Sequence, residues 1–179
     1  EDDALLSADA GGIIKEWQGF TDRSYISLEV RGRKKLLGPQ MEGLARLYQD
    51  RTGAAAYLLW PSGAEILLRH AARRAALADA MICAAYDLEG WQAEPALAIQ
   101  LDQCAAYGID PPLATRSQID AVAKPNEAAP GARFRLRRIK AQLRMGWRQV
   151  THLGRAQRRD VAVSAGLAEM AARLVAQDS

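Results

Sequence analysis

The stretch Tyr25-Ile26-Ser27-Leu28-Glu29-Val30 has the clearest strand pattern in the sequence. Its apolar residues alternate with the polar Ser27 and Glu29, and a period of two predicts a strand with one buried face and one exposed face. The preceding residues 21–24 have the composition of a turn. The sequence therefore predicts a β-hairpin over residues 12–31.

The residues that follow this strand favour a helix. Between Pro39 and Gly53, the apolar residues Met41, Leu44, Leu47 and Tyr48 have the spacing of one face of a helix. A second helix is predicted over residues 92–107, because Leu97, Leu101 and Cys104 share one helical face and Gly108 can end the element.

Between these two helices, residues 54–68 allow two interpretations. Residues 54–60 form a short apolar run that is compatible with a strand, with residues 64–68 as its partner. Alternatively, Ser62 and Glu65 form a capping box at the start of a helix. The alanine-rich residues 71–85 favour this second interpretation, and we expect a helix over residues 64–88.

The fold class that follows is α+β and mostly α: a helical bundle with a small N-terminal β-hairpin and a basic helical C-terminal part. Residues 124–132 are predicted to be a linker, because this stretch contains Pro and Gly and no apolar periodicity. Residues 1–123 then form a mixed α/β scaffold or partner-binding domain. Residues 133–179 form a basic helical segment, with helices over 133–153 and 157–176.

Size and composition exclude several classes of protein. The chain has 179 residues, of which 49% are hydrophobic and 25% are charged, as in a globular domain and unlike a disordered chain. The apolar runs are shorter than the ~18–20 residues that span a bilayer. The first three residues are acidic, unlike the start of a signal peptide. Cys83 and Cys104 are too few for a disulfide scaffold, so the sequence favours the cytoplasm.

The sequence contains no motif that indicates a catalytic or metal site. His70 and His152 are its two histidines, and neither they nor the cysteines have the spacing of a zinc site. The glycine-rich phosphate-binding loops are missing too. We therefore expect no metal and no cofactor, and we name no catalytic residue; an enzyme with a site in residues 1–123 is the less favoured class.

Charge is distributed unevenly along the chain. Residues 1–130 contain 13 Lys/Arg and 18 Asp/Glu, a balance of −5, whereas residues 131–179 contain 11 and 3, a balance of +8. Ten basic residues and no acidic residue lie between Arg133 and Arg159. A block of this kind is typical of a segment that meets a polyanion. The alternative is a solvated face that docks on the acidic part of the same chain.

A helical arrangement of residues 133–155 would separate this charge from an apolar stripe. The stripe, which we expect to pack on the rest of the protein, contains Leu136, Ile139, Leu143, Trp147 and Val150. In an unbroken helix the adjacent flank carries Arg133, Arg137, Lys140, Arg144, Arg148, Arg155, Arg158 and Arg159. From Arg133 to Arg155 that ridge would extend for ~33 Å. Gly146 and Gly154 each cost about 1 kcal/mol in a helix interior, so the ridge can divide at either one.

Repulsion between like charges four residues apart opposes such a helix unless an anion compensates. The phosphates of a nucleic acid meet that need, and Arg suits bidentate phosphate contact better than Lys does. We therefore predict a non-catalytic nucleic-acid-binding protein, with DNA favoured. The predicted contacts are Arg133, Arg137, Lys140, Arg144, Arg148 and Arg155, and secondary contacts are Arg31, Arg33, Lys34, Lys35, Arg69 and Arg73.

A different class of function explains the same segment. In this alternative the protein is an interaction or assembly module, and its basic helix docks on an acidic protein surface. An anionic membrane surface is a further alternative for a basic amphipathic helix that contains a tryptophan. A homo-oligomer is compatible with either class.

Overall fold

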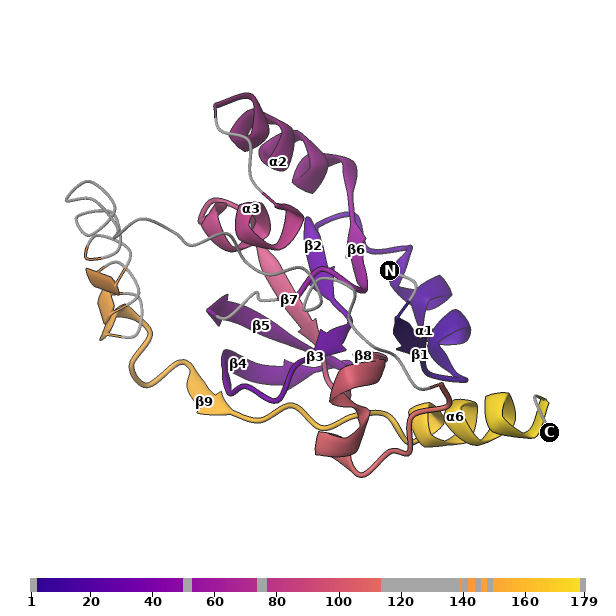
Figure 1. The fold of residues 1–179 in the computed structure, drawn as a ribbon. Helices are drawn as coiled ribbons and strands as arrows, with labels where there is room; N and C mark the ends of the chain where they lie inside the picture. Colours follow the sequence, from indigo (N-terminus) through magenta and orange to yellow (C-terminus); the bar gives the residue numbers. More distant parts are fainter. Residues whose placement is uncertain are drawn as a thin grey trace, which may run out of the picture.

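A six-stranded mixed β-sheet forms the centre of the molecule (Figure 1). The computed structural model describes residues 3–49, 53–73, 77–113 and 150–177, together with 139, 142, 143, 146 and 147. In order across the sheet, the strands are β6 (Tyr57–Leu59), β2 (Tyr25–Ser27), β7 (Gly90–Ala93), β5 (Leu44–Gln49), β4 (Lys35–Met41) and β9 (Gln157–Arg159). Only β2 and β7 are parallel; the other neighbours in this sheet are antiparallel.

A second sheet of three strands continues from the first. It consists of β1 (Ala4–Leu6), β8 (Ala98–Gln100) and β3 (Glu29–Val30), with β8 between the other two. The strand β3 follows β2 after the single residue Leu28, so one extended segment contributes to both sheets.

Helices lie around these sheets. They are α1 (Ala10–Trp17), α2 (Pro61–Arg73), α3 (Ala78–Ala84), the 3₁₀-helix η1 (Leu101–Tyr107) and α6 (Ala165–Gln177). In Figure 1, α2 and α3 lie together at the upper end of the molecule, and α6 lies at the opposite end, where it contacts β1.

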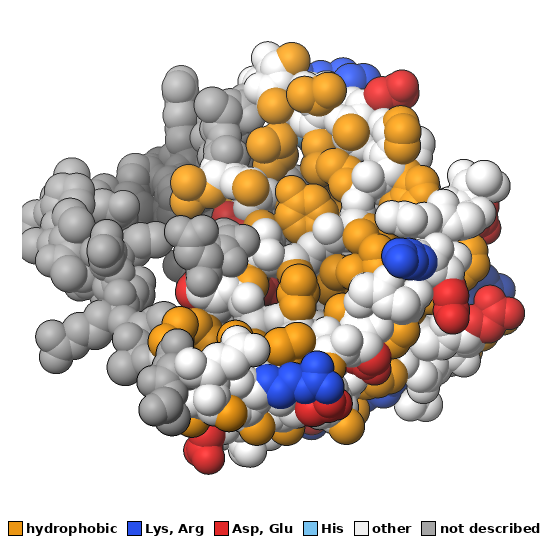
Figure 2. Space-filling view, turned by 90° about the vertical axis from the view of Figure 1, so that its right-hand side faces the viewer, with side chains coloured by type: hydrophobic (Ala, Val, Ile, Leu, Met, Phe, Trp, Pro, Cys, Tyr) orange, Lys and Arg blue, Asp and Glu red, His pale blue; other side chains and the backbone are white. Residues whose placement is uncertain are grey.

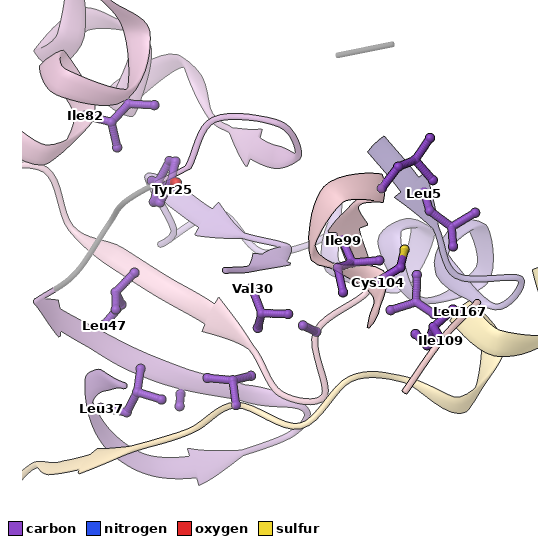
Figure 3. Close-up of a cluster of buried hydrophobic side chains, with 14 of the residues drawn as sticks. Leu5, Tyr25, Val30, Leu37, Leu47, Ile82, Ile99, Cys104, Ile109 and Leu167 are labelled. Carbon is purple, nitrogen blue, oxygen red and sulfur yellow. The ribbon is translucent and has the colours of Figure 1, made fainter. Parts of the chain in front are cut away.

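One hydrophobic cluster joins residues that are far apart in the sequence (Figure 3). Tyr25 of β2, Leu47 of β5, Ile82 of α3, Ile99 of β8 and Leu167 of α6 all belong to it. Val161 and Ala171 are also members. Residues 157–177, which were predicted to belong to the basic segment, therefore contribute Val161, Leu167 and Ala171 to the same core as the N-terminal strands.

The prediction of a mostly helical bundle is wrong. Nine strands in two sheets are present in the described part of the chain. The predicted helix from Met41 to Tyr48 is a hairpin of β4 and β5, which turns at Glu42 (φ +52°) and Gly43 (φ +75°). Two central residues with positive φ are typical of a type I′ hairpin turn. The strand β5 buries Leu44, Ala45 and Leu47, so it lacks a simple alternation.

The predicted N-terminal hairpin is also wrong. Residues 25–30 do form strands, as predicted, but residues 10–17 are the helix α1. The partners of β2 are β6 and β7, which lie much later in the sequence. Ser27 and Glu29, expected on an exposed face, are 1% and 0% exposed, since this segment lies inside the fold.

Three other predicted helices differ from the structure. The expected helix over 64–88 is two helices, α2 and α3, and β6 precedes them. Residues 92–107 contain the end of β7, all of β8 and the 3₁₀-helix η1. The expected helix over 157–176 begins as the strand β9, and α6 starts only at Ala165. Each mistaken segment contains short apolar runs, for which helix and strand cannot be separated by periodicity alone.

Candidate nucleic-acid interface

The pairing of β4 with β9 joins two basic clusters of the sequence. The register places Lys35 opposite Arg159, Leu36 opposite Arg158 and Leu37 opposite Gln157. Residues 31–34 lead directly into β4, and residue 155 lies two positions before β9. The pair is antiparallel, so residues 31–34 lie beyond its Lys35–Arg159 end, whereas Arg155 lies near its other end, beside Gly38 and Pro39. One edge of the six-stranded sheet therefore carries both clusters, 31–34 and 155–158, and we call it the β4–β9 basic edge.

Four side chains of this edge are exposed: Arg33, Lys34, Arg155 and Arg158. Lys34 Nζ lies 3.9 Å from the Asp160 carboxylate, and both side chains are more than half exposed, so this pair is weak. Within the described residues, Arg33 and Arg155 have no ion-pair partner. The basic edge therefore carries positive charge that the described carboxylates compensate only in part.

The helical ridge ends before this edge. Residues 150 and 151 are helical, and the N–H groups of Arg155 and Ala156 both donate to the carbonyl of His152, at 3.0 Å each. Gly154 has φ +83°, a left-handed conformation that ends helices. An unbroken helix through Arg159 is therefore excluded, and Arg155 belongs to the turn that leads into β9.

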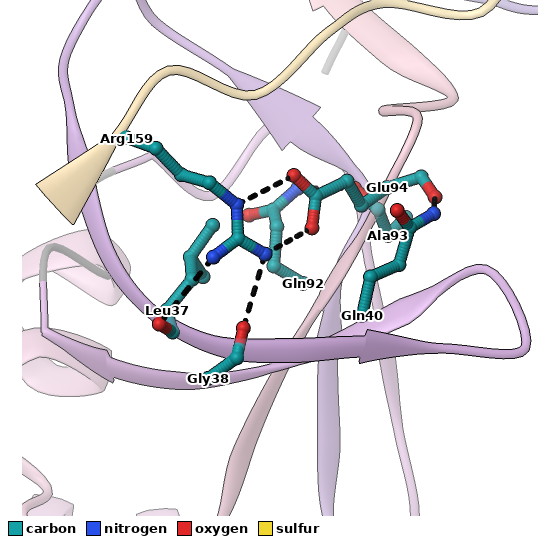
Figure 4. Close-up of polar contacts among 7 residues, drawn as sticks. All are labelled: Leu37, Gly38, Gln40, Gln92, Ala93, Glu94 and Arg159. Carbon is teal, nitrogen blue, oxygen red and sulfur yellow. Dashed lines mark hydrogen bonds and ion pairs between the residues drawn. The ribbon is translucent and has the colours of Figure 1, made fainter. Parts of the chain in front are cut away.

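The side chain of Arg159 is directed into the protein and not toward solvent (Figure 4). Its Nε and a terminal nitrogen donate to the two carboxylate oxygens of Glu94, at 3.0 and 2.6 Å. The same terminal nitrogen donates to the carbonyl of Gly38 at 3.0 Å. The Glu94 side chain is only 11% exposed. This arginine is thus a structural connection between β9, β4 and β7, and its charge is compensated internally.

Lys35, one of the predicted secondary contacts, is 2% exposed. Its ammonium donates to the side-chain oxygen of Gln92, to the carbonyl of Glu29 at 3.0 Å and to the hydroxyl of Ser27 at 3.4 Å. A buried ammonium requires hydrogen-bond acceptors of this kind. The structure therefore places Lys35 inside the sheet, where it does not reach a ligand at the surface.

Arg31 and Arg33 line a pocket of about 570 Å³. The loop between them meets the start of α3 and the helix η1 at this point. Gly32 N–H donates to the Tyr107 hydroxyl at 2.8 Å, which attaches the loop to η1. The two arginines therefore flank an anchored glycine, and both line the same pocket.

Arg69 and Arg73 lie on α2, away from the β4–β9 basic edge. The helix α2 follows β6, which is the opposite edge of the same sheet from β9 (Figure 1). Arg69 lies 3.8 Å from the Asp87 carboxylate, which also bonds His70 at 2.6 Å. The hydrogen bond with His70 is the main cause that lowers the pKa of Asp87. This pair of arginines forms no common surface with the residues at 155–158.

The predicted contacts Arg133, Arg137, Lys140, Arg144 and Arg148 lie outside the described residues, as do the predicted linker and the first part of the basic segment. Four members of the apolar stripe are described, and each is helical. Ile139, Leu143, Trp147 and Val150 are 52, 69, 69 and 57% exposed. The expectation that this stripe packs on the rest of the protein is wrong for these four residues.

The opposite side of the molecule has a different surface. Figure 2 shows the face on the side of α1, where apolar side chains gather at the centre and lysines and arginines lie apart from one another. No comparable grouping of basic side chains is visible on that face.

The described ranges contain no group of three His, Cys, Asp or Glu side chains that could hold a metal ion. Cys104 is buried, and burial raises the pKa of its thiol, which disfavours the reactive thiolate. Within the same ranges, no helix has the length and apolar character that crossing a membrane requires.

Sequence reasoning did not identify Asp79, Gln103 or Tyr107, which surround the Arg31–Arg33 loop. These three residues come from separate elements, and no spacing in the sequence connects them to the loop. Comparison with protein-family models, curated proteins and solved structures finds no match to this chain.

Proposed function

We propose that this chain is a non-catalytic nucleic-acid-binding protein, with DNA as the favoured target, that contacts the phosphate backbone through Arg33, Lys34, Arg155 and Arg158. The observation that supports the proposal is the β4–β9 pairing, which places two basic clusters along one sheet edge, one toward each end of the strand pair. That edge continues in the sequence from a segment, 133–155, that contains no acidic residue.

Counterion release supplies the driving force for such binding. A duplex carries a dense layer of condensed cations, and each phosphate that an arginine neutralises releases some of them. Arg33 and Arg155 suit this role because their charge has no carboxylate partner in the described part of the chain. Affinity should therefore depend steeply on salt and weakly on base sequence.

A salt titration with matched variants tests the proposal. We expect the wild-type protein to bind a 20-base-pair duplex at 50 mM salt, in a filter-binding or fluorescence-anisotropy assay. The triple variant Arg33→Gln/Arg155→Gln/Arg158→Gln should reduce the slope of log K against log salt by about 0.9 for each lost contact. A second variant, Arg137→Gln/Arg144→Gln/Arg148→Gln, tests the predicted ridge in the same way.

The control is Arg69→Gln/Arg73→Gln, which removes two exposed charges from α2 at the other edge of the sheet. This variant should leave the salt slope unchanged. Negligible binding by the wild-type protein at 50 mM salt, or equal losses in the control and the triple variant, would remove the proposal.

A second candidate function is supported by the exposed stripe of Ile139, Leu143, Trp147 and Val150. Phosphates do not cover apolar side chains, and a protein surface does. In this alternative the chain is an interaction module whose basic segment docks on an acidic partner. Trp147→Ser/Leu143→Ser should then abolish self-association or partner capture in analytical ultracentrifugation and leave the salt slope for DNA intact.

A further inference from the structure

The pocket at the Arg31–Arg33 loop differs from the rest of the basic edge because it is concave. Its volume is about 570 Å³, and its lining comes from the loop after β3, from the first turn of α3 and from η1. A flat basic edge meets the outside of a nucleic-acid backbone, whereas a pocket of this volume admits a compact group such as a single nucleotide.

The loop is held in place on two sides. Gly32 has φ +60°, and its N–H donates to the Tyr107 hydroxyl at 2.8 Å. The aliphatic part of Arg31 packs beside Gly53, where an added Cβ would lie 3.1 Å from Arg31 Cδ. Arg31 is accordingly half-buried and Arg33 is exposed. Arg31 and Arg33 thus line the pocket from an anchored turn, and an ordered turn lowers the entropy cost of binding an anion.

The charge of the pocket is asymmetric. Arg31 and Arg33 have no ion-pair partner within the described ranges. The acidic side chain in the lining is Asp79, whose Oδ1 accepts the N–H of Ala80 at 2.6 Å. Gln103 adds an amide to the lining. The pocket therefore offers guanidinium donors from one element, and a carboxylate and an amide from two others.

We propose that this pocket binds a nucleotide that carries a phosphomonoester, and that its physiological ligand is the phosphorylated end of a nucleic-acid strand. The phosphomonoester would be held by Arg31 and Arg33, and the base edge by Asp79 and Gln103. The identification of a strand end rests on the proposed function; the chemistry of the pocket does not.

Charge explains why a strand end fits better than an internal phosphate. A phosphomonoester carries close to two negative charges at neutral pH, while an internal phosphodiester carries one. Paired guanidinium groups recognise phosphate oxygens in a bidentate manner. The carboxylate of Asp79 repels a bare anion, and it can accept a hydrogen bond from the amino group of a base. A whole nucleotide can bind the arginines through its phosphate and the Asp79 side through its base, whereas inorganic phosphate can bind only the arginines.

The test compares single-stranded oligonucleotides of one sequence that carry a 5′-phosphate, a 3′-phosphate or hydroxyl groups at both ends. We expect the wild-type protein to bind one of the phosphorylated forms at least about tenfold more tightly than the hydroxyl form. Arg33→Gln should abolish this preference. Arg155→Gln, outside the pocket, should weaken all three oligonucleotides equally and keep the preference. Tyr107→Phe, which removes the anchor of Gly32, should reduce the preference by a smaller factor.

The outcomes separate this proposal from the proposed function. Tight binding of all three oligonucleotides without a preference overturns the pocket proposal and leaves nucleic-acid binding intact. If no oligonucleotide binds, the proposed function fails. Calorimetric titration with nucleoside 5′- and 3′-monophosphates then tests separately whether the pocket binds a nucleotide. Saturable binding that Arg33→Gln removes supports a free nucleotide as the ligand, and no heat with any of the nucleotides overturns the pocket proposal completely.

Discussion

At the scale of single residues, polar side chains inside the fold connect the strands. Arg159 and Glu94 form a two-bond ion pair, and the Arg159 side chain is 29% exposed. Lys35 and Gln92 form a second connection, in which both side chains are buried. The sequence could not distinguish Arg159 and Lys35 from the surface arginines. A local cluster of basic residues does not show whether a given side chain is solvated or pairs with a polar group that is distant in the sequence.

Removal of the Arg159 guanidinium should destabilise the fold. Arg159→Met leaves the Glu94 carboxylate poorly solvated, and we expect a loss of about 2–4 kcal/mol in the free energy of unfolding. The double variant Arg159→Met/Glu94→Gln should recover most of that loss. Urea denaturation measures both values. A single-variant loss below about 0.5 kcal/mol would show that the pair is not a structural connection.

The pair of His70 and Asp87 predicts an acid-sensitive contribution to stability. The pKa of Asp87 is lowered from 3.8, mainly by the hydrogen bond with His70. A lowered folded-state pKa gives stability that is present above the unfolded-state pKa and is lost as the pH falls through the folded-state pKa. The melting temperature of the wild-type protein should exceed that of Asp87→Asn at pH 5, and the difference should shrink as the pH falls below 3.8 and through the lowered folded-state pKa. A difference independent of pH would contradict this assignment.

At the scale of elements, the β4–β5 hairpin shows why the sequence predicted a helix where a hairpin forms. Leu44 and Leu47 are three residues apart, which suits a helical face, and both are buried in β5. A central strand covered on both faces carries apolar residues on both sides, so its alternation is lost. The informative signal is Glu42-Gly43, since both residues need positive φ between the two strands.

Substitution of Gly43 should therefore be more harmful than substitution of a helical glycine. Gly43→Ala places a Cβ at φ +75° and 3.5 Å from the Trp17 ring, and we expect a cost of about 1–2 kcal/mol in unfolding free energy. Gly12→Ala is the matched control, because nothing lies within 4 Å of its added Cβ in α1. That variant should gain about 0.5–1 kcal/mol. Thermal unfolding that ranks the two variants in the reverse order would contradict the turn assignment.

At the scale of the whole molecule, the sequence did not predict which strands pair with one another. The strand at 25–30 and the charge block at 133–159 follow from local patterns. The pairing of β4 with β9 joins residues more than 100 positions apart, such as Arg159 and Leu37, with a separation of 122. No local period contains that information. The basic edge is a consequence of this pairing, and the pocket at Arg31–Arg33 depends on a separate meeting of the loop after β3 with α3 and η1.

Amide chemical-shift mapping on addition of a short DNA duplex at 50 mM salt tests whether β4–β9 pairing builds one nucleic-acid surface. We expect the amides of residues 31–34 and 155–158 to shift with the same midpoint, while amides around Arg69 and Arg73 on α2 stay in place. Shifts confined to α2, or different midpoints for the two basic clusters, would contradict it.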